Sequence, residues 1–300
     1  MRCILATCHP LDTPEEDGMK RMIDRLPELV IAVAACGLWL HGPIPQLPHY
    51  HEFADQRVLL GVPNGANVLS NIGFAVVGLW GLFRLWPARR KPQLARGWPG
   101  YRLFFIALVL TALGSSFYHL DPDNGRLIWD RLPIALACAG LLAGVYAESC
   151  PNIDGRRVTV LLAFAAVLSV AWWYVTEQEG QGDLRPYLLL QGLPLLLSPL
   201  WQAIGNARRA DRVAFGVAIA LYAAAKVTEL RDWELLTALG WISGHTAKHV
   251  LATASAAVLA GRLVWRVPHA ASRDQDQLPL GQHGSVRRTP NPYGMFGTWH

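Results

Sequence analysis

Two histidines spaced four residues apart lie inside an apolar stretch late in the chain, in the segment Gly244-His245-Thr246-Ala247-Lys248-His249. On a helix, residues i and i+4 project from one face, so His245 and His249 can bind the same metal ion. Buried imidazoles need polar partners, and a divalent cation would satisfy both. The spacing therefore favours a metal site over simple packing. It disfavours a haem, because two histidines so close on one helix do not straddle a porphyrin.

A second pair with the same spacing, Ser115 and His119, ends an earlier apolar stretch. Taken alone, it is better explained as a serine bonded to its own helix and a histidine at the membrane interface. Asp130 follows in Trp129-Asp130-Arg131-Leu132-Pro133, where the chain is expected to re-enter the membrane. The simple structural interpretations are an N-cap for Asp130 and first-turn positions for Arg131 and Pro133.

Together these residues form the set that a zinc hydrolase needs. Three histidines, His119, His245 and His249, leave a fourth position on zinc for water, whose pKa falls to about 7. A carboxylate such as Asp130 can act as general base and then return the proton to the leaving group. A hydroxyl such as Ser115 can stabilise the oxyanion that forms on an attacked carbonyl. The set predicts catalytic Ser115 and Asp130 beside a three-histidine zinc site.

The elements that must position these residues are membrane helices. The chain has 300 residues, of which 52% are hydrophobic and only 16% charged, against about 25% charged in soluble domains. A membrane-spanning helix needs about 20 mostly apolar residues. The apolar stretches predict eight spans: Glu28–His41, Gly65–Trp86, Arg102–Tyr118, Leu132–Ala147, Arg157–Val175, Pro186–Ile204, Val213–Val227 and Leu235–Leu263. The first is short, and the last is long enough for its opening turns to lie at the interface.

The net charge of +5 does not indicate a nucleic-acid partner, because Lys and Arg are spread over the connections between apolar stretches. They concentrate in every second connection, most clearly in the acid-free segment from Arg84 to Arg102. Cytoplasmic loops are enriched in Lys and Arg. We therefore expect a multi-pass membrane protein with both termini in the cytoplasm and the Ser, His and Asp residues toward the extracytoplasmic side. The short Ala-rich spans and Arg-rich loops suggest a bacterial inner membrane.

The expected organisation is an all-α, seven-helix membrane bundle with one extra N-terminal helix. Residues 1–27 form a cytoplasmic segment, residues 28–41 an extra anchor, residues 51–265 the catalytic core, and residues 268–300 a flexible cytoplasmic tail. Two polar groups are expected to be structural. The first group is Lys226, Glu229 and Asp232, with an ion pair between Lys226 and Glu229 on one helix face. The second group is Asn64, Asn67, Ser70 and Asn71, which would cap the outer end of the second predicted span and hold it in place by hydrogen bonds.

The order of these motifs resembles the alkaline ceramidase family, within a superfamily that also holds adiponectin-receptor-like proteins. The resemblance rests on Ser115-x3-His119, Asp130 and His245-x3-His249, with Asn67-Val68-Leu69-Ser70-Asn71 similar to the family's Asn-x-x-Ser-Asn motif. It covers roughly His51 to Leu263. It implies a zinc hydrolase that cleaves a ceramide amide to a sphingoid base and a fatty acid, with His119, His245 and His249 as ligands.

The chain departs from that family in the region of its acidic calcium-binding stretch. Here the corresponding segment is Tyr50-His51-Glu52-Phe53-Ala54-Asp55-Gln56-Arg57. Glu52, Asp55 and Asn64 still offer oxygen atoms for Ca²⁺ as a second cation. Because that site is incomplete, another amide- or ester-linked membrane lipid is an alternative substrate.

Two other functions fit the same motifs. One is a receptor-like or scaffold protein with a structural zinc, which the superfamily also contains. The other is a metal-ion transporter that uses the histidine pair as a transit site. A transporter would need polar residues that continue toward the cytoplasmic ends of the spans, where the sequence shows few.

Overall fold

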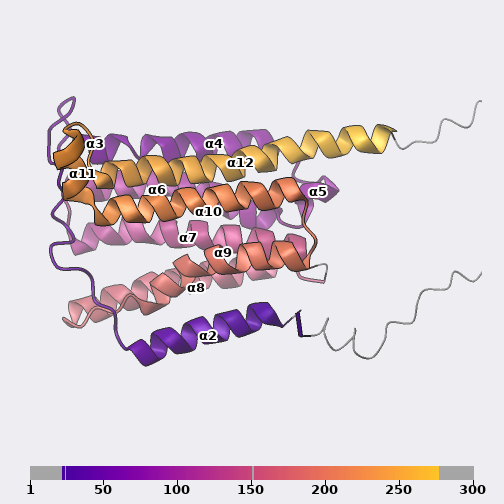
Figure 1. Ribbon diagram of the computed structural model, residues 1–300, viewed down its shortest axis with the longest axis horizontal. Coiled ribbons are helices and arrows are strands. Elements are labelled where there is room, and N and C mark those ends of the chain that lie inside the picture. Colours follow the sequence, from indigo (N-terminus) through magenta and orange to yellow (C-terminus); the bar gives the residue numbers. More distant parts are fainter. Residues whose placement is uncertain (1–21, 24, 151, 277–300) are drawn as a thin grey trace, which may run out of the picture.

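The computed structural model describes residues 22–276 except 24 and 151, with side chains described as far as residue 267. It is an all-α bundle in which seven helices are long and apolar enough to cross a membrane. Figure 1 shows them running side by side, with the short helices α3 and α11 at one end and α5 at the other. The spans are Gly65–Leu85, Trp98–Leu120, Asn124–Ser149, Gly155–Gln178, Arg185–Ile204, Arg209–Leu230 and Gly244–Val267.

Six of these spans close into a ring. The first span is made of α3 (Gly65–Leu69) and α4 (Ile72–Leu85), and it packs on α6 (Trp98–Leu120). From there the ring continues through α7 (Asn124–Ser149), α9 (Arg185–Ile204), α10 (Arg209–Leu230) and α12 (Gly244–Asp276), which returns to α4. The one remaining span, α8 (Gly155–Gln178), lies outside the ring and packs against α6, α7 and α9. This arrangement leaves an enclosed space that all six ring spans can line.

The extra N-terminal helix is present as α2, Leu26–His41, which packs on α9 at the edge of the bundle (Figure 1). Its 16 residues rise about 24 Å, less than the roughly 30 Å of a bilayer core. A complete crossing by α2 therefore stays a prediction. Most of the N-terminal segment 1–27 lies outside the described residues.

Three predicted boundaries were wrong. The predicted last span, Leu235–Leu263, is two helices, because α11 (Asp232–Leu239) ends at Gly240 in a left-handed conformation before α12 begins. The predicted fourth span began at Leu132, but α7 begins at Asn124 and is capped by the Asp123 side chain, which accepts from the Arg126 amide. The tail expected from Pro268 starts as a continuation of α12 to Asp276, and the rest of it lies outside the described residues.

The early start of α7 changes the interpretation of Asp130 and Pro133. Both lie inside the helix and are buried, so Asp130 is not an N-cap. A carboxylate within a membrane span is costly unless it has a partner or a function. The fold thus removes the simplest structural explanation for Asp130.

Close packing of α6 on α7 depends on glycine. A methyl group on Gly114 of α6 would overlap the main-chain oxygen of Trp129 on α7. Small residues let helix backbones approach closely in membrane proteins. This contact sets Ser115, the residue after Gly114, beside Asp130, the residue after Trp129.

Candidate metal centre

The three predicted ligands come together between α6 and α12. His119 is in the last turn of α6, while His245 and His249 are in the first turns of α12. One nitrogen from each ring lies within 4.8 Å of the other two, and all three side chains are buried. The structure therefore confirms a buried three-histidine group that can hold a metal ion. His119 is 126 residues away from His245 in the sequence.

The spacing of the nitrogens fits a tetrahedral metal. Nε2 of His119 and Nε2 of His245 are 3.2 Å apart. Two ligands at the Zn–N distance of about 2.0–2.1 Å, held at a tetrahedral angle, would have nitrogens roughly 3.3 Å apart. A cation shared by the three rings would stabilise nitrogen atoms that otherwise face one another.

Ser70 holds the ring of His249. Its hydroxyl donates to the main-chain oxygen of Asn67 at 3.0 Å and lies 2.8 Å from Nδ1 of His249. Because a hydroxyl has one proton, Ser70 must accept from Nδ1–H of His249, and the lone pair of His249 is then on Nε2. Sequence reasoning expected Ser70 only to knit the helix end. Its place in Asn67-x-x-Ser70-Asn71 was the available signal for this role.

The start of α12 is fixed by two further contacts. Asn67 is fully buried, and its side-chain oxygen accepts from the Thr246 hydroxyl at 2.7 Å. The Asp232 carboxylate accepts from the amide of His245 at 2.7 Å and from that of Ala54 at 2.9 Å. Asp232 is therefore structural, as predicted. These contacts fix the helix turn that carries two of the three imidazoles.

Lys248 is a close neighbour of the histidine group that sequence reasoning did not single out. Its ammonium lies 3.0 Å from Nε2 of His245 and 3.0 Å from the Glu229 carboxylate. Lys226 approaches the other Glu229 oxygen at 2.8 Å, which confirms the predicted ion pair. Since an ammonium can only donate, Nε2 of His245 carries the lone pair. A metal on that nitrogen must displace Lys248, which retains Glu229 as a partner.

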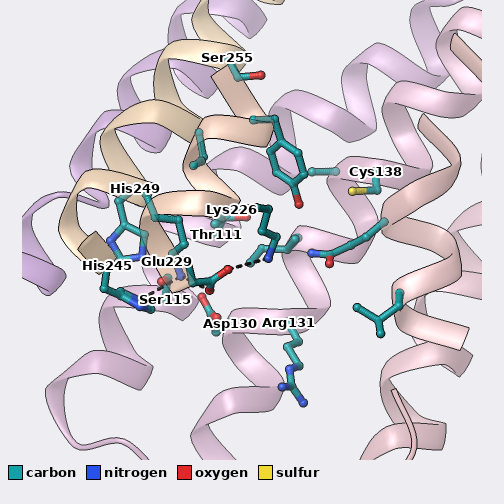
Figure 2. Close-up of a pocket in the computed structure, with 18 of the residues that line it drawn as sticks. Thr111, Ser115, Asp130, Arg131, Cys138, Lys226, Glu229, His245, His249 and Ser255 are labelled. Carbon is teal, nitrogen blue, oxygen red and sulfur yellow. Dashed lines mark hydrogen bonds and ion pairs between the residues drawn. The ribbon is translucent and has the colours of Figure 1, made fainter. Parts of the chain in front are cut away.

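Ser115 and Asp130 lie together on the wall beside this centre. Both are buried, and the residues before them, Gly114 and Trp129, are in close contact. They line one cavity with His245 and His249 (Figure 2). Ser116, by contrast, donates to the main-chain oxygen of Val68. The structure thus brings the predicted serine and aspartate next to each other and next to the histidine group.

The cavity has a volume of about 820 Å³ and is lined mainly by apolar side chains. Polar groups gather near the histidines, where Asp130, Glu229 and Lys226 point toward the same space (Figure 2). Farther along α12, the lining passes Ser255 to Leu259 and the apolar side chains of α9 and α10. The cavity therefore has a polar end at the metal centre and an apolar interior suited to a hydrocarbon chain.

The three residues suggested for a second cation each have another partner. The Asp55 carboxylate is bonded to Arg57 at 2.8 and 2.7 Å, and this guanidinium lowers the pKa of Asp55. Glu52 is paired with His49 at 2.7 Å, and the Asn64 side-chain amide donates to the main-chain oxygen of His119 at 2.9 Å. Calcium would have to displace Arg57, so the Ca²⁺ site stays a prediction without support from these contacts.

Comparison with known proteins identified no relative: no protein-family model, curated protein or solved structure matches the chain.

Proposed function

We propose that the chain is an integral-membrane, zinc-dependent lipid amidase of the alkaline ceramidase type. The observation that carries this proposal is a buried three-histidine group beside the buried residues Ser115 and Asp130. They lie at the polar end of an apolar cavity inside a membrane bundle. The proposed substrate is a ceramide-like lipid, and the products are a sphingoid base and a fatty acid.

The three histidines would hold zinc, which supplies an activated water and polarises the amide carbonyl. Asp130 would take a proton from the attacking water and give it to the leaving amine. Ser115 would donate a hydrogen bond to the oxygen of the attacked carbonyl, where negative charge develops. The apolar interior would bind the acyl chain and keep bulk water from the amide.

The proposed setting is a bacterial inner membrane, with the metal centre toward the extracytoplasmic side and both termini in the cytoplasm. Two observations support this orientation. The Arg84–Arg102 connection is at the end of the bundle opposite α3 and α11, which lie beside the histidine group (Figure 1). The start of α2 and the end of α12 are also at that opposite end (Figure 1). Cytoplasmic loops are rich in Lys and Arg.

The deciding experiment measures zinc content and lipid amide cleavage on the same purified preparations. Wild-type protein should contain one zinc and release fatty acid from an amide lipid. His245→Ala should lose both properties. Asp130→Asn should retain zinc and lose activity by about 100-fold or more, because it removes the general base. His41→Ala, at the exposed end of α2, is the matched control and should retain both.

The alternatives give different outcomes. If the wild-type protein contains zinc but cleaves no amide lipid, a receptor or scaffold with a structural metal is favoured. Metal uptake that is lost in a knockout would favour a transporter. Unchanged amide cleavage in His245→Ala would contradict the proposal directly.

A further inference from the structure

Arg131 is buried in a box of aromatic rings at one side of the cavity. Its side chain is 3% exposed. The guanidinium lies 4.0 Å from the ring centre of Trp173 on α8, 5.1 Å from that of Tyr50 in the loop before α3, and 5.6 Å from that of Tyr187 on α9. Sequence reasoning took Arg131 for an ordinary first-turn residue. The structure instead places a permanent positive charge among three rings.

This guanidinium has no carboxylate partner among the described residues. Its Nη1 atom is buried without a hydrogen bond. Arg185, an arginine that also contacts an aromatic ring, Trp39, is bonded to Asp183 through Nε and Nη2. A buried charge without a partner is costly, and contacts with ring faces at about 0.5–2 kcal/mol offset only part of that cost. An anion bound in the cavity would therefore stabilise the Arg131 guanidinium.

No carboxylate makes an ion pair with Arg131 in the described part of the chain. Glu229 is paired with Lys226 and Lys248, and the Asp130 carboxylate points toward Ser115. Other carboxylates at the rim have their own contacts: Glu52 with His49, Asp232 with main-chain amides, and Glu234 near Arg231. Arg131 thus lines the cavity as a buried cation that has no ion pair among the described residues.

Arg131 and Asp130 point in different directions from α7. In Figure 2, the Asp130 carboxylate points toward Ser115, whereas the Arg131 side chain points away from it. Both residues line the same cavity. A molecule whose amide is at Asp130 can therefore place a group beyond the amide against Arg131, while its acyl chain extends toward Ser255 and Leu259.

We propose that Arg131 binds an anionic headgroup of the lipid substrate, a carboxylate or a phosphate a few bonds from the scissile amide. Guanidinium groups bind these two anions through paired N–H donors. This inference rests on the proposed amidase function and narrows its substrate class. The preferred substrate is an acidic amide lipid, such as an N-acyl amino acid, and a neutral ceramide is a poorer one.

The test compares amides with one acyl chain and different headgroups. N-palmitoylglycine carries a carboxylate, N-palmitoyl-phosphoethanolamine carries a phosphate, and N-palmitoylethanolamine is the neutral match. We expect wild-type kcat/KM to be about tenfold or more higher for an anionic substrate than for the neutral one, because a buried donor is left unpaired by the neutral group. The two anionic arms show which oxyanion is preferred.

Arg131→Gln should bring the anionic-to-neutral ratio close to one. Arg185→Gln, which changes a carboxylate-paired arginine outside the cavity lining, should leave the ratio at its wild-type value. If Arg131→Gln does not fold, Arg131→Lys must lower the ratio at least threefold, since lysine lacks the bidentate fork. A wild-type ratio near one, or a ratio unchanged in the Arg131 variants, overturns the proposal.

Calorimetric binding to the Asp130→Asn protein separates this proposal from the amidase function. The anionic amide should bind about tenfold more tightly than the neutral one, and Arg131→Gln in that background should remove the difference. If wild-type protein cleaves no amide but this difference is found, the amidase function fails and the anion site stands. If amides are cleaved but no difference is found, Arg131 only holds the helices together.

Discussion

The Ser70 hydroxyl connects the α3–α4 span to the metal centre by lying 2.8 Å from Nδ1 of His249. The Ser70 hydroxyl donates its proton to the main-chain oxygen of Asn67, so it accepts a hydrogen bond from His249 and the imidazole carries its hydrogen on Nδ1. Outer contacts of this kind orient a metal-binding histidine and raise its basicity. A residue on α3–α4 thereby controls a ligand that is 179 positions away in sequence.

Ser70→Ala should therefore weaken zinc binding. The variant leaves Nδ1 of His249 without its acceptor and frees the ring to rotate. We expect zinc affinity to fall about 10- to 100-fold, as is usual when such a partner is lost. The measurement is chelator competition on the purified protein.

Ser169→Ala is the control for that experiment. Ser169 is also buried and also donates to a main-chain oxygen, that of Ala166, but it is on α8 outside the ring. It should leave zinc affinity within about threefold of wild type. Equal zinc affinities for Ser70→Ala and Ser169→Ala would show that Ser70 does not act on the metal centre.

Lys248→Met should have the opposite effect and strengthen zinc binding. The Lys248 ammonium and a metal ion compete for Nε2 of His245, and two cations close together repel. We expect zinc affinity to rise about fivefold or more. Lys226→Met removes a charge from the same carboxylate without a bond to histidine and should have a smaller effect. A weaker zinc affinity in Lys248→Met would mean that Lys248 supports the site.

Much of the architecture follows from sequence periodicity alone. Long apolar stretches determine the seven spans, because a single segment that crosses lipid satisfies its own backbone only as a helix, which needs about 20 residues. The histidine pair is visible because His245 and His249 share a helix face. The start of α7 was missed because the polar residues from Asn124 to Arg131 resemble a loop, although Asp123 caps them as a helix.

Residues that act through tertiary contacts could not be predicted in this way. Arg131 looks like an interfacial charge until Tyr50, Trp173 and Tyr187 meet around it from three separate segments. Lys248 looks like an ordinary member of a helix turn until Glu229 from α10 reaches it. Spacing along one helix shows which side chains share a face, but the packing partner determines what that face does.

The Asp183–Arg185 pair before α9 predicts how stability depends on pH. Burial by itself would raise the pKa of Asp183, but hydrogen bonds from Arg185, Trp172 and the Ile44 amide lower it from 3.8 to about 2. A carboxyl with a lowered folded-state pKa stabilises the fold above its unfolded pKa, and that contribution is lost as pH falls through the folded value. The pair should thus contribute about 2 kcal/mol above pH 4 and progressively less toward pH 2.

The check on Asp183 is the difference in unfolding free energy between wild type and Asp183→Asn. Because other carboxyls titrate in both proteins, the difference isolates this pair. It should be largest at pH 5 to 7 and shrink as pH falls from 4 to 2. A difference that is constant from pH 6 to pH 2 would contradict the assigned role of the ionised carboxylate.

Gly114→Ala should disrupt catalysis through helix spacing. The added methyl group would overlap the main-chain oxygen of Trp129, so α6 and α7 must separate, and Ser115 moves away from Asp130. We expect a lower unfolding temperature and a loss of amide cleavage of about tenfold or more, since small displacements of catalytic groups are costly. Gly216→Ala on α10 is the control, because a methyl group added there would have no described atom within 4 Å apart from its chain neighbours and the backbone of its own helix. It should keep full activity and be as stable as wild type or slightly more so, because alanine favours helix over glycine. If both variants are equally stable and active, contact at Gly114 does not set the distance between Ser115 and Asp130.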